Sequence, residues 1–100
     1  MIALFRFDSG PDGEESFLAS ARAVLAVLRD RPGYRRGWLG RAADEPTEWV
    51  LGTEWEGAGS YRRALSSVEV RADAGRFLST ARNEATAFEV VVADEQGGHR

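Results

Sequence analysis

The stretch TEWVLGTEWEGAGSYRRAL, residues 47–65, decides the fold. Its first half alternates with the period of a β-strand, and the side chains on one face are those of Trp49, Leu51, Thr53 and Trp55. After Gly57 the period becomes helical, and Ser60 is a suitable N-cap for a helix that starts at Tyr61. A tryptophan-rich strand running into a helix with two arginines predicts a wall and the lip of a small pocket. The alternative is that the tryptophans are core and the arginines are solvated.

Composition narrows the class of protein. A chain of 100 residues with 43% apolar residues forms one domain with a modest core. A net charge of −3 and a pI near 5.1 argue against a nucleic-acid surface. There is no cysteine, and the single histidine, His99, lies near the end of the chain. This excludes disulfides and thiolate chemistry and argues against a histidine metal site or a Ser-His-Asp triad.

The beginning of the chain, MIALFRFDSG, indicates a strand rather than a targeting segment. Its apolar run is too short for a signal peptide. No stretch approaches the length needed to cross a membrane. We therefore expect a soluble cytoplasmic protein that engages neither a membrane nor nucleic acid.

The segment before residue 34 predicts a strand and a helix. Residues 2–8 alternate with apolar side chains on both faces, which is typical of a strand covered on both sides. Asp12 and Glu15 have the spacing of a capping box, and Pro32-Gly33 ends the helix. The helical stripe consists of Phe17, Leu18, Ala21, Val24, Leu25 and Leu28.

Residues 34–43 predict a second strand, joined by a hairpin loop at 44–47 to the strand that begins the key stretch. With a four-residue loop, Trp38 lies near Thr53 and Arg36 near Trp55. Trp38 then shares a face with the other two tryptophans, and Arg41 shares the opposite face with Glu54. A slip of one residue reverses this assignment.

The rest of the chain predicts a second helical region to residue 82, with a kink at Ser66-Ser67, and a last strand at 86–93. The order β-α-β-β-α-β predicts an α+β, ferredoxin-like protomer, with a four-stranded antiparallel sheet and both helices on one face. We expect this domain to span residues 1–93, with a flexible tail at 94–100. The uncovered apolar face predicts a homodimer joined sheet to sheet.

The element order, the Arg-Pro-Gly-Tyr sequence at 31–34 and the run at residues 49–65 resemble the antibiotic biosynthesis monooxygenase family. The resemblance covers roughly residues 1–93. It implies a dimeric α/β barrel whose enzymes oxidise planar aromatic molecules with O2 and use no metal, flavin or haem. It also implies a pocket between sheet and helices, built from tryptophan, tyrosine, asparagine and arginine.

Matched position by position, Trp55 corresponds to the family tryptophan at the end of the third strand. Many members carry a glutamate where this chain has Thr53, and many carry a histidine where it has Ala64. Strand one contains no asparagine, so haem degradation by this chain is not expected.

Eight residues are candidates for a role in such a pocket, Trp55 from the family match and the others from their place in the predicted strands and helices. The catalytic candidates are Trp55, which stacks on the substrate, Tyr61, which relays a proton, and Arg41, which holds an oxyanion. The substrate-binding candidates are Trp38, Trp49, Tyr34, Arg62 and Arg71. Glu54 is the candidate base. For Arg41 and Glu54 the alternative is an ion pair at the centre of the dimer barrel. For the tryptophans it is core packing, and for the tyrosines and the helix arginines it is a solvated polar group. No cofactor is expected.

The predicted pocket is compatible with three alternative functions. The first is a cofactor-independent monooxygenase acting on a phenolic or quinone precursor. The second is a non-catalytic ligand-binding or assembly protein with the same barrel. The third is a cyclase or isomerase that performs no oxygen chemistry.

Overall fold

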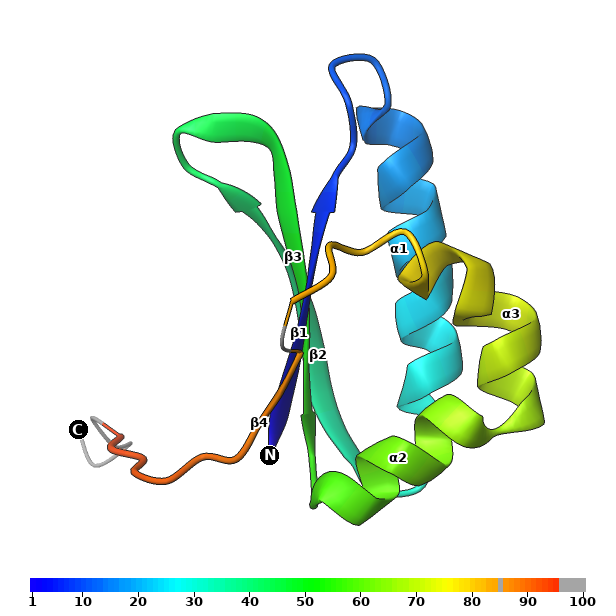
Figure 1. Ribbon diagram of the computed structural model, residues 1–100, viewed down its shortest axis with the longest axis vertical. Helices are drawn as coiled ribbons and strands as arrows, with labels where there is room; N and C mark the ends of the chain where they lie inside the picture. Colours follow the sequence, from blue (N-terminus) through cyan, green and yellow to red (C-terminus); the bar gives the residue numbers. More distant parts are fainter. Residues whose placement is uncertain (85, 96–100) are drawn as a thin grey trace.

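A computed structural model describes residues 1–84 and 86–95 (Figure 1). The elements are β1 (Ile2–Asp8), α1 (Glu14–Arg29), β2 (Tyr34–Ala42), β3 (Glu45–Trp55), α2 (Ala58–Ser66), α3 (Val68–Leu78) and β4 (Ala87–Phe88). This order confirms the predicted α+β, ferredoxin-like fold. Most of the expected tail, residues 96–100 with His99, lies outside the described residues. Within the described part, no helix is long and apolar enough to cross a membrane.

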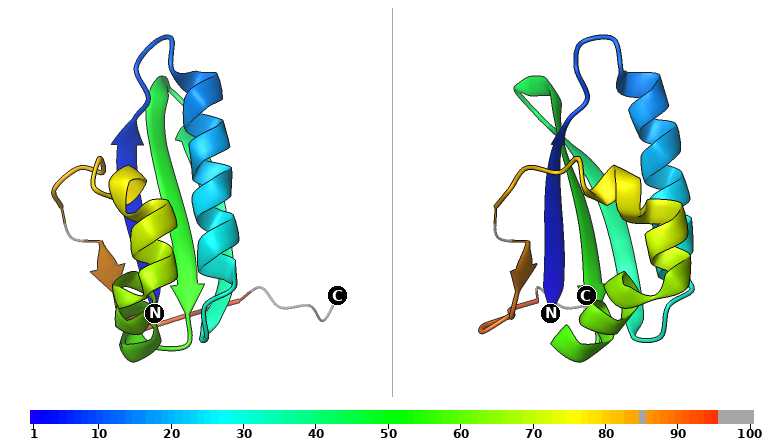
Figure 2. Two further views of the ribbon diagram at one scale, coloured as in Figure 1. Left: turned by 90° about the vertical axis from the view of Figure 1, so that its right-hand side faces the viewer. Right: turned by 45° about the vertical axis from the view of Figure 1, so that its right-hand side comes forward.

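The four strands form one antiparallel sheet in the order β2-β3-β1-β4. All three helices cover the same face of this sheet, and the opposite face is uncovered (Figures 1 and 2). We call the two sides the helix face and the open face. β3 and β1 both have partners on both edges, and β3, with 11 residues, is the longer of these two inner strands.

Successive side chains of β3 lie on opposite faces of the sheet. On the helix face its side chains are buried, and they are those of Trp49, Leu51, Thr53 and Trp55. They meet the buried stripe of α1, which consists of Phe17, Ala21, Val24 and Leu28. On the open face Ile2, Leu4 and Val50 are only half-buried. The sequence period therefore places the core on one side of the sheet, as predicted.

The start of α1 differs from the prediction. The N-cap is Gly13, and no side chain caps the helix, so the expected capping box of Asp12 and Glu15 does not form. The two glutamates of the first turn, Glu14 and Glu15, still lie near the positive end of the helix dipole. Its end fits the prediction, because Gly33 adopts a left-handed conformation (φ 89°) that ends the helical path.

The predicted register of the β2–β3 hairpin was wrong by one residue. Trp38 pairs with Gly52 rather than Thr53, and Arg36 pairs with Glu54 rather than Trp55. The cause is a shorter loop, since Ala42 already pairs with Glu45, together with the irregularity between Arg41 and Ala42. Trp38 is consequently on the open face, away from the other tryptophans.

The helical region after β3 breaks where the sequence suggests. Ser67 lies between α2 and α3 in an extended conformation, and its hydroxyl accepts a hydrogen bond from the Val70 amide. The start of α2 is earlier than predicted, at Ala58. Ser60 still caps this helix, but from inside its first turn, because its hydroxyl contacts both backbone polar groups of Gly57.

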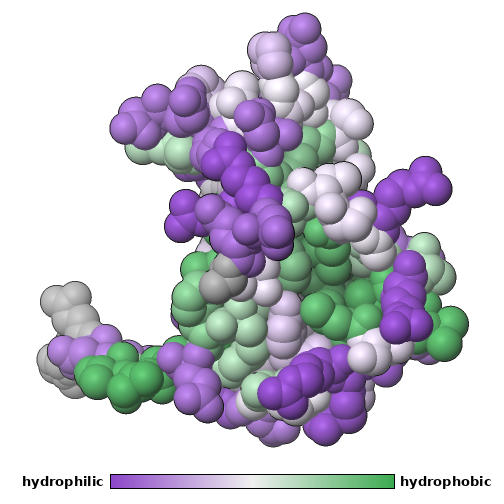
Figure 3. Space-filling model, viewed as in Figure 1, coloured by the Kyte–Doolittle hydropathy of each residue, from purple (hydrophilic) through white to green (hydrophobic). Residues whose placement is uncertain are grey.

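The last strand is much shorter than the predicted 86–93. β4 contains only Ala87 and Phe88, because β1 begins at Ile2, which pairs with Phe88, and provides no partner beyond it. The chain then leaves the sheet and exposes Val90, Val91 and Val92. These valines form the apolar projection at the lower left of Figure 3.

The pairing of Trp38 with Gly52 generates a stability prediction. A Cβ atom on Gly52 would lie 2.3–2.6 Å from the Trp38 indole, whereas one on Gly40 would meet only Val50, at 3.4 Å. Gly52→Ala should lower the free energy of unfolding by about 1–2 kcal/mol because the ring must move. Gly40→Ala, the matched control, should change it by less than about 0.5 kcal/mol. Urea unfolding followed by circular dichroism measures both, and equal effects would contradict the close packing.

Candidate functional site

Three aromatic rings gather where β3 ends and α2 begins. The Trp55 ring lies 5.4 Å from that of Tyr34, at an interplanar angle of 90°, and 5.9 Å from that of Tyr61, at 60°. Such edge-to-face contacts are favourable because ring edges and faces carry opposite partial charges. β2, β3 and α2 each contribute one ring. The structure thus brings together three of the eight predicted site residues, and we call them the aromatic cluster.

Thr53 orients the central ring of this cluster. The Trp55 Nε1–H group donates a buried hydrogen bond of 2.8 Å to the Thr53 hydroxyl. Both side chains are on the helix face of β3, two residues apart, and the exposed fraction of Trp55 is 0%. The sequence analysis noted Thr53 only as a departure from the family glutamate. The i, i+2 spacing on one strand face is the signal that would have identified it as a partner of Trp55.

Burial raises the pKa of both tyrosines of the cluster. Desolvation raises the pKa of Tyr61 above its usual value of 10.0, and a hydrogen bond with the Thr86 side chain opposes this shift. Desolvation likewise raises the pKa of Tyr34, and the charge of Arg29 opposes it. Thr86 was not predicted as a site residue. At neutral pH both phenols are therefore hydrogen-bond donors rather than bases.

The aromatic cluster is closed in this structure. Trp55 at its centre has no exposed surface, and three cavities along the described residues are lined by residues outside the cluster. One cavity of about 360 Å³ lies mainly on the open face, against Leu4, Gly40 and Val50. Another, of about 220 Å³, adjoins the start of α2 at Gly57 and Ser60. A ligand reaches Trp55 only if a side chain of the cluster moves.

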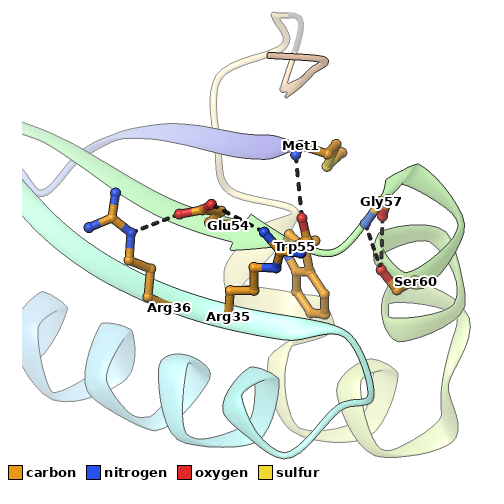
Figure 4. Close-up of polar contacts among 7 residues, drawn as sticks. All are labelled: Met1, Arg35, Arg36, Glu54, Trp55, Gly57 and Ser60. Atoms are coloured by element: carbon orange, nitrogen blue, oxygen red, sulfur yellow. Dashed lines mark hydrogen bonds and ion pairs between the residues drawn. The ribbon is translucent and has the colours of Figure 1, made fainter. Parts of the chain in front are cut away.

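Trp38 lies apart from the cluster, on the open face. Its indole covers Gly52, and the Arg36 guanidinium lies 5.5 Å from the ring centre. Arg36 also binds Glu54 through a 2.8 Å hydrogen bond, and Arg35 lies 3.9 Å from the same carboxylate. Figure 4 shows these contacts beside Trp55, whose side chain is on the other face. Glu54 is therefore an ion-pair partner and cannot be the base of the cluster.

Arg41 and Trp49 form a separate group near the start of α1. Arg41 pairs with Trp49 across the ladder, lies 5.1 Å from its ring centre, and contacts Glu14 at 2.9 Å. The prediction that Arg41 shares a strand face with Glu54 was thus wrong, because the register slip moves Arg41 to the helix face. Trp49 also packs on Phe17 and is buried.

The remaining candidates are solvent-exposed on two helices. Arg62 on α2 and Arg71 on α3 are both exposed, and neither forms an ion pair with another described residue. Across residues 1–84 and 86–95, no three His, Cys, Asp or Glu side chains gather as metal ligands would. The chemistry of the cluster thus rests on its rings and hydroxyl groups.

The raised pKa of Tyr61 predicts loss of stability in alkali. The unfolded chain loses the phenol proton near pH 10, before the folded chain does, so unfolding becomes more favourable as the pH rises above 10. Urea unfolding between pH 8 and 11 should show this decline. In Tyr61→Phe the decline should be smaller, and an unchanged slope would contradict burial of the phenol. Phenolate absorbance of the folded protein provides an independent titration.

Comparison with known proteins identifies the family. The model of the family described as antibiotic biosynthesis monooxygenase matches residues 1–75. A variant of SnoaB, a cofactor-independent oxygenase from Streptomyces nogalater, superposes with a TM-score of 0.79 at 21% identity, covering 92% of this chain and 93% of that one. Rv0793 from Mycobacterium tuberculosis gives 0.68 at 20% identity, covering 96% and 97%. No curated protein matches the sequence significantly. Because the family model covers three quarters of its length, this chain belongs to the antibiotic biosynthesis monooxygenase family.

Proposed function

We propose that this protein is a cofactor-independent monooxygenase that oxidises a planar phenolic or quinone-precursor molecule with O2. Family membership and the fold shared with SnoaB, an oxygenase described as cofactor-independent, support the reaction class. The observation that carries the proposal is the aromatic cluster, in which one indole and two neutral phenols meet beside the Thr53 hydroxyl. This set of groups suits a flat substrate with an ionisable oxygen.

The proposed reaction converts a ring methylene into a ketone. The substrate loses a proton and becomes an enolate, which passes one electron to O2, and the resulting radical and superoxide combine to form a carbon-bound peroxide. Loss of water from the protonated peroxide leaves the carbonyl group, so that CH2 and O2 give C=O and H2O. The substrate supplies all four electrons, and one oxygen atom enters the product.

In this proposal the cluster stabilises the enolate rather than removing the proton. Trp55 provides a flat wall, and the neutral phenol of Tyr61 donates a hydrogen bond to the enolate oxygen. Glu54 forms an ion pair with Arg36 on the open face, so water removes the proton from the substrate. The acidity of the phenolic substrate itself assists this step. The rate should therefore rise with pH until the bound substrate is ionised.

One observation favours a second candidate function. Because Glu54 is engaged by Arg36 and Arg35 on the open face and no carboxylate has been placed in the cluster, the rings also suit a protein that binds a small molecule without transforming it. A cyclase or isomerase would use the same groups. Both alternatives differ from the monooxygenase in consuming no oxygen.

Oxygen uptake tests the proposed reaction. With 1,8-dihydroxyanthrone in buffer containing EDTA, the protein should consume one O2 per substrate above the spontaneous rate, and ¹⁸O2 should label the product carbonyl. Tyr61→Phe should lower kcat by about 10–100-fold, since one donor to the enolate is lost. Val68→Ala, at an exposed residue, is the control for general damage. Uptake equal to that without protein would contradict the monooxygenase, and saturable binding with no uptake would support the binding protein.

We also propose that two copies associate through their open faces. Ile2, Leu4, Trp38 and Val50 place half-buried apolar side chains on the uncovered sheet. The exposed valines after β4 extend the apolar surface beyond it. Contiguous apolar side chains on an uncovered sheet mark an interaction surface, and a second copy would bury both parts.

Analytical ultracentrifugation tests this association. The wild-type protein should sediment at twice the chain mass of 11.0 kDa. Leu4→Arg should shift it to the monomer, because a charge buried between the sheets lacks a partner. Val68→Arg places the same charge on exposed α3 and should leave the dimer intact. Dissociation by both variants, or by neither, would contradict an interface on the open face.

A further inference from the structure

Tyr34 differs from the other two rings of the cluster in how it is held. Trp55 and Tyr61 are buried, whereas Tyr34 is partly exposed. Its backbone lies between Gly33, with a positive φ, and an irregularity of the β2–β3 ladder that leaves Arg35 without a partner on β3. No described residue accepts a hydrogen bond from its hydroxyl group. Tyr34 is thus the ring that can leave at the lowest cost.

The ring of Tyr34 fills a space that the backbone keeps open. Its hydroxyl oxygen lies over Gly37, where a Cβ atom would come within 2.4 Å of it and within 2.8 Å of a Leu25 methyl. Gly37 pairs with Thr53, which pairs with Ala3 on its other side. Small side chains therefore flank the Thr53 hydroxyl on the helix face. We call the space bounded by Leu25, Gly37, Thr53 and Trp55 the Tyr34 slot.

We propose that the Tyr34 slot is the binding site for the phenolic ring of the substrate, and that Tyr34 occupies it until the substrate displaces it. The inference rests on the proposed function for the identity of the ligand, a planar molecule with a hydroxyl at one end. Tyr34 itself is such a ring, seated edge to face against Trp55. A substrate phenol in the same position regains this contact and needs no new space.

The hydroxyl of Thr53 gives the slot its polar anchor. It accepts the hydrogen bond of Trp55, and no described residue accepts the proton of its own hydroxyl. The Tyr34 hydroxyl at the Gly37 end makes no hydrogen bond with Thr53, so a phenol or phenolate oxygen that accepts this proton must lie nearer to Thr53 than the Tyr34 oxygen does. Donation from Trp55 polarises the Thr53 hydroxyl and strengthens it as a donor. Specificity then follows from Gly37, since any side chain there would take the place of the substrate oxygen.

Proton NMR tests displacement in the wild-type protein. The chain has only two tyrosines, so the Tyr34→Phe spectrum assigns their ring signals. With 2-naphthol under argon, the Tyr34 ring should lose its nuclear Overhauser contacts to Trp55 and shift towards exposed values, while Tyr61 keeps its contacts. Naphthalene, which lacks the hydroxyl, should bind at least about tenfold more weakly. Binding of 2-naphthol with all Tyr34–Trp55 contacts retained would overturn the proposal.

A cavity variant provides the second test. Tyr34→Ala empties the slot, and p-cresol should bind it at least about tenfold more tightly than it binds wild type, because no ring needs displacing. Adding Gly37→Ala should abolish this gain. If p-cresol binds wild type, Tyr34→Ala and the double variant with equal affinity, the proposed slot is wrong. Neither measurement depends on turnover, so both remain informative if turnover fails. Naphthol binding that displaces Tyr34, together with no oxygen uptake from 1,8-dihydroxyanthrone, would retain the slot and contradict the monooxygenase.

Discussion

The two-sided character of β3 is the constraint on which the rest of the structure depends. Its helix-face side chains form the floor of the core, and burial of each large apolar one contributes about 1.5–3 kcal/mol. The same alternation places Glu48, Val50, Gly52 and Glu54 on the open face. A strand with these two faces requires helices on one side and favours a protein surface on the other. The fold, the aromatic cluster and the proposed dimer therefore share one cause.

The aromatic cluster gains its order from a polar contact within an apolar layer. An indole N–H group inside a core costs free energy unless an acceptor meets it, and Thr53 provides one for Trp55. Trp49 has no such partner, since its buried Nε1 atom forms no hydrogen bond with the described residues. The contrast indicates that the orientation of Trp55 is fixed more strictly than packing alone requires.

The order and type of the elements could be predicted because each depends on local periodicity and on nearby stop signals such as Pro32-Gly33. The partners of Trp38 and Arg41 could not, because a register is set by bulges and loop length, which single-residue patterns do not encode. The length of β4 depends on where β1 begins in space. Within the site, the proximity of Trp55 and Tyr61 could be predicted, because both lie in one continuous stretch of sequence. The contact of Tyr34 with Gly37 joins residues on either side of a bulge and appears only in three dimensions.

The distribution of the three tryptophans has a practical consequence for spectroscopy. Trp55 is buried and hydrogen-bonded. Trp49 is buried, has an arginine over its ring, and finds no acceptor for its N–H group among the described residues. Trp38 is on the open face beside Arg36. Indole emission depends on the polarity around the ring, so each fluorophore should have a spectrum of its own. The aromatic cluster, the Arg41–Trp49 group and the uncovered sheet thus each contain an intrinsic optical probe, which variants with a single tryptophan would report without an external dye.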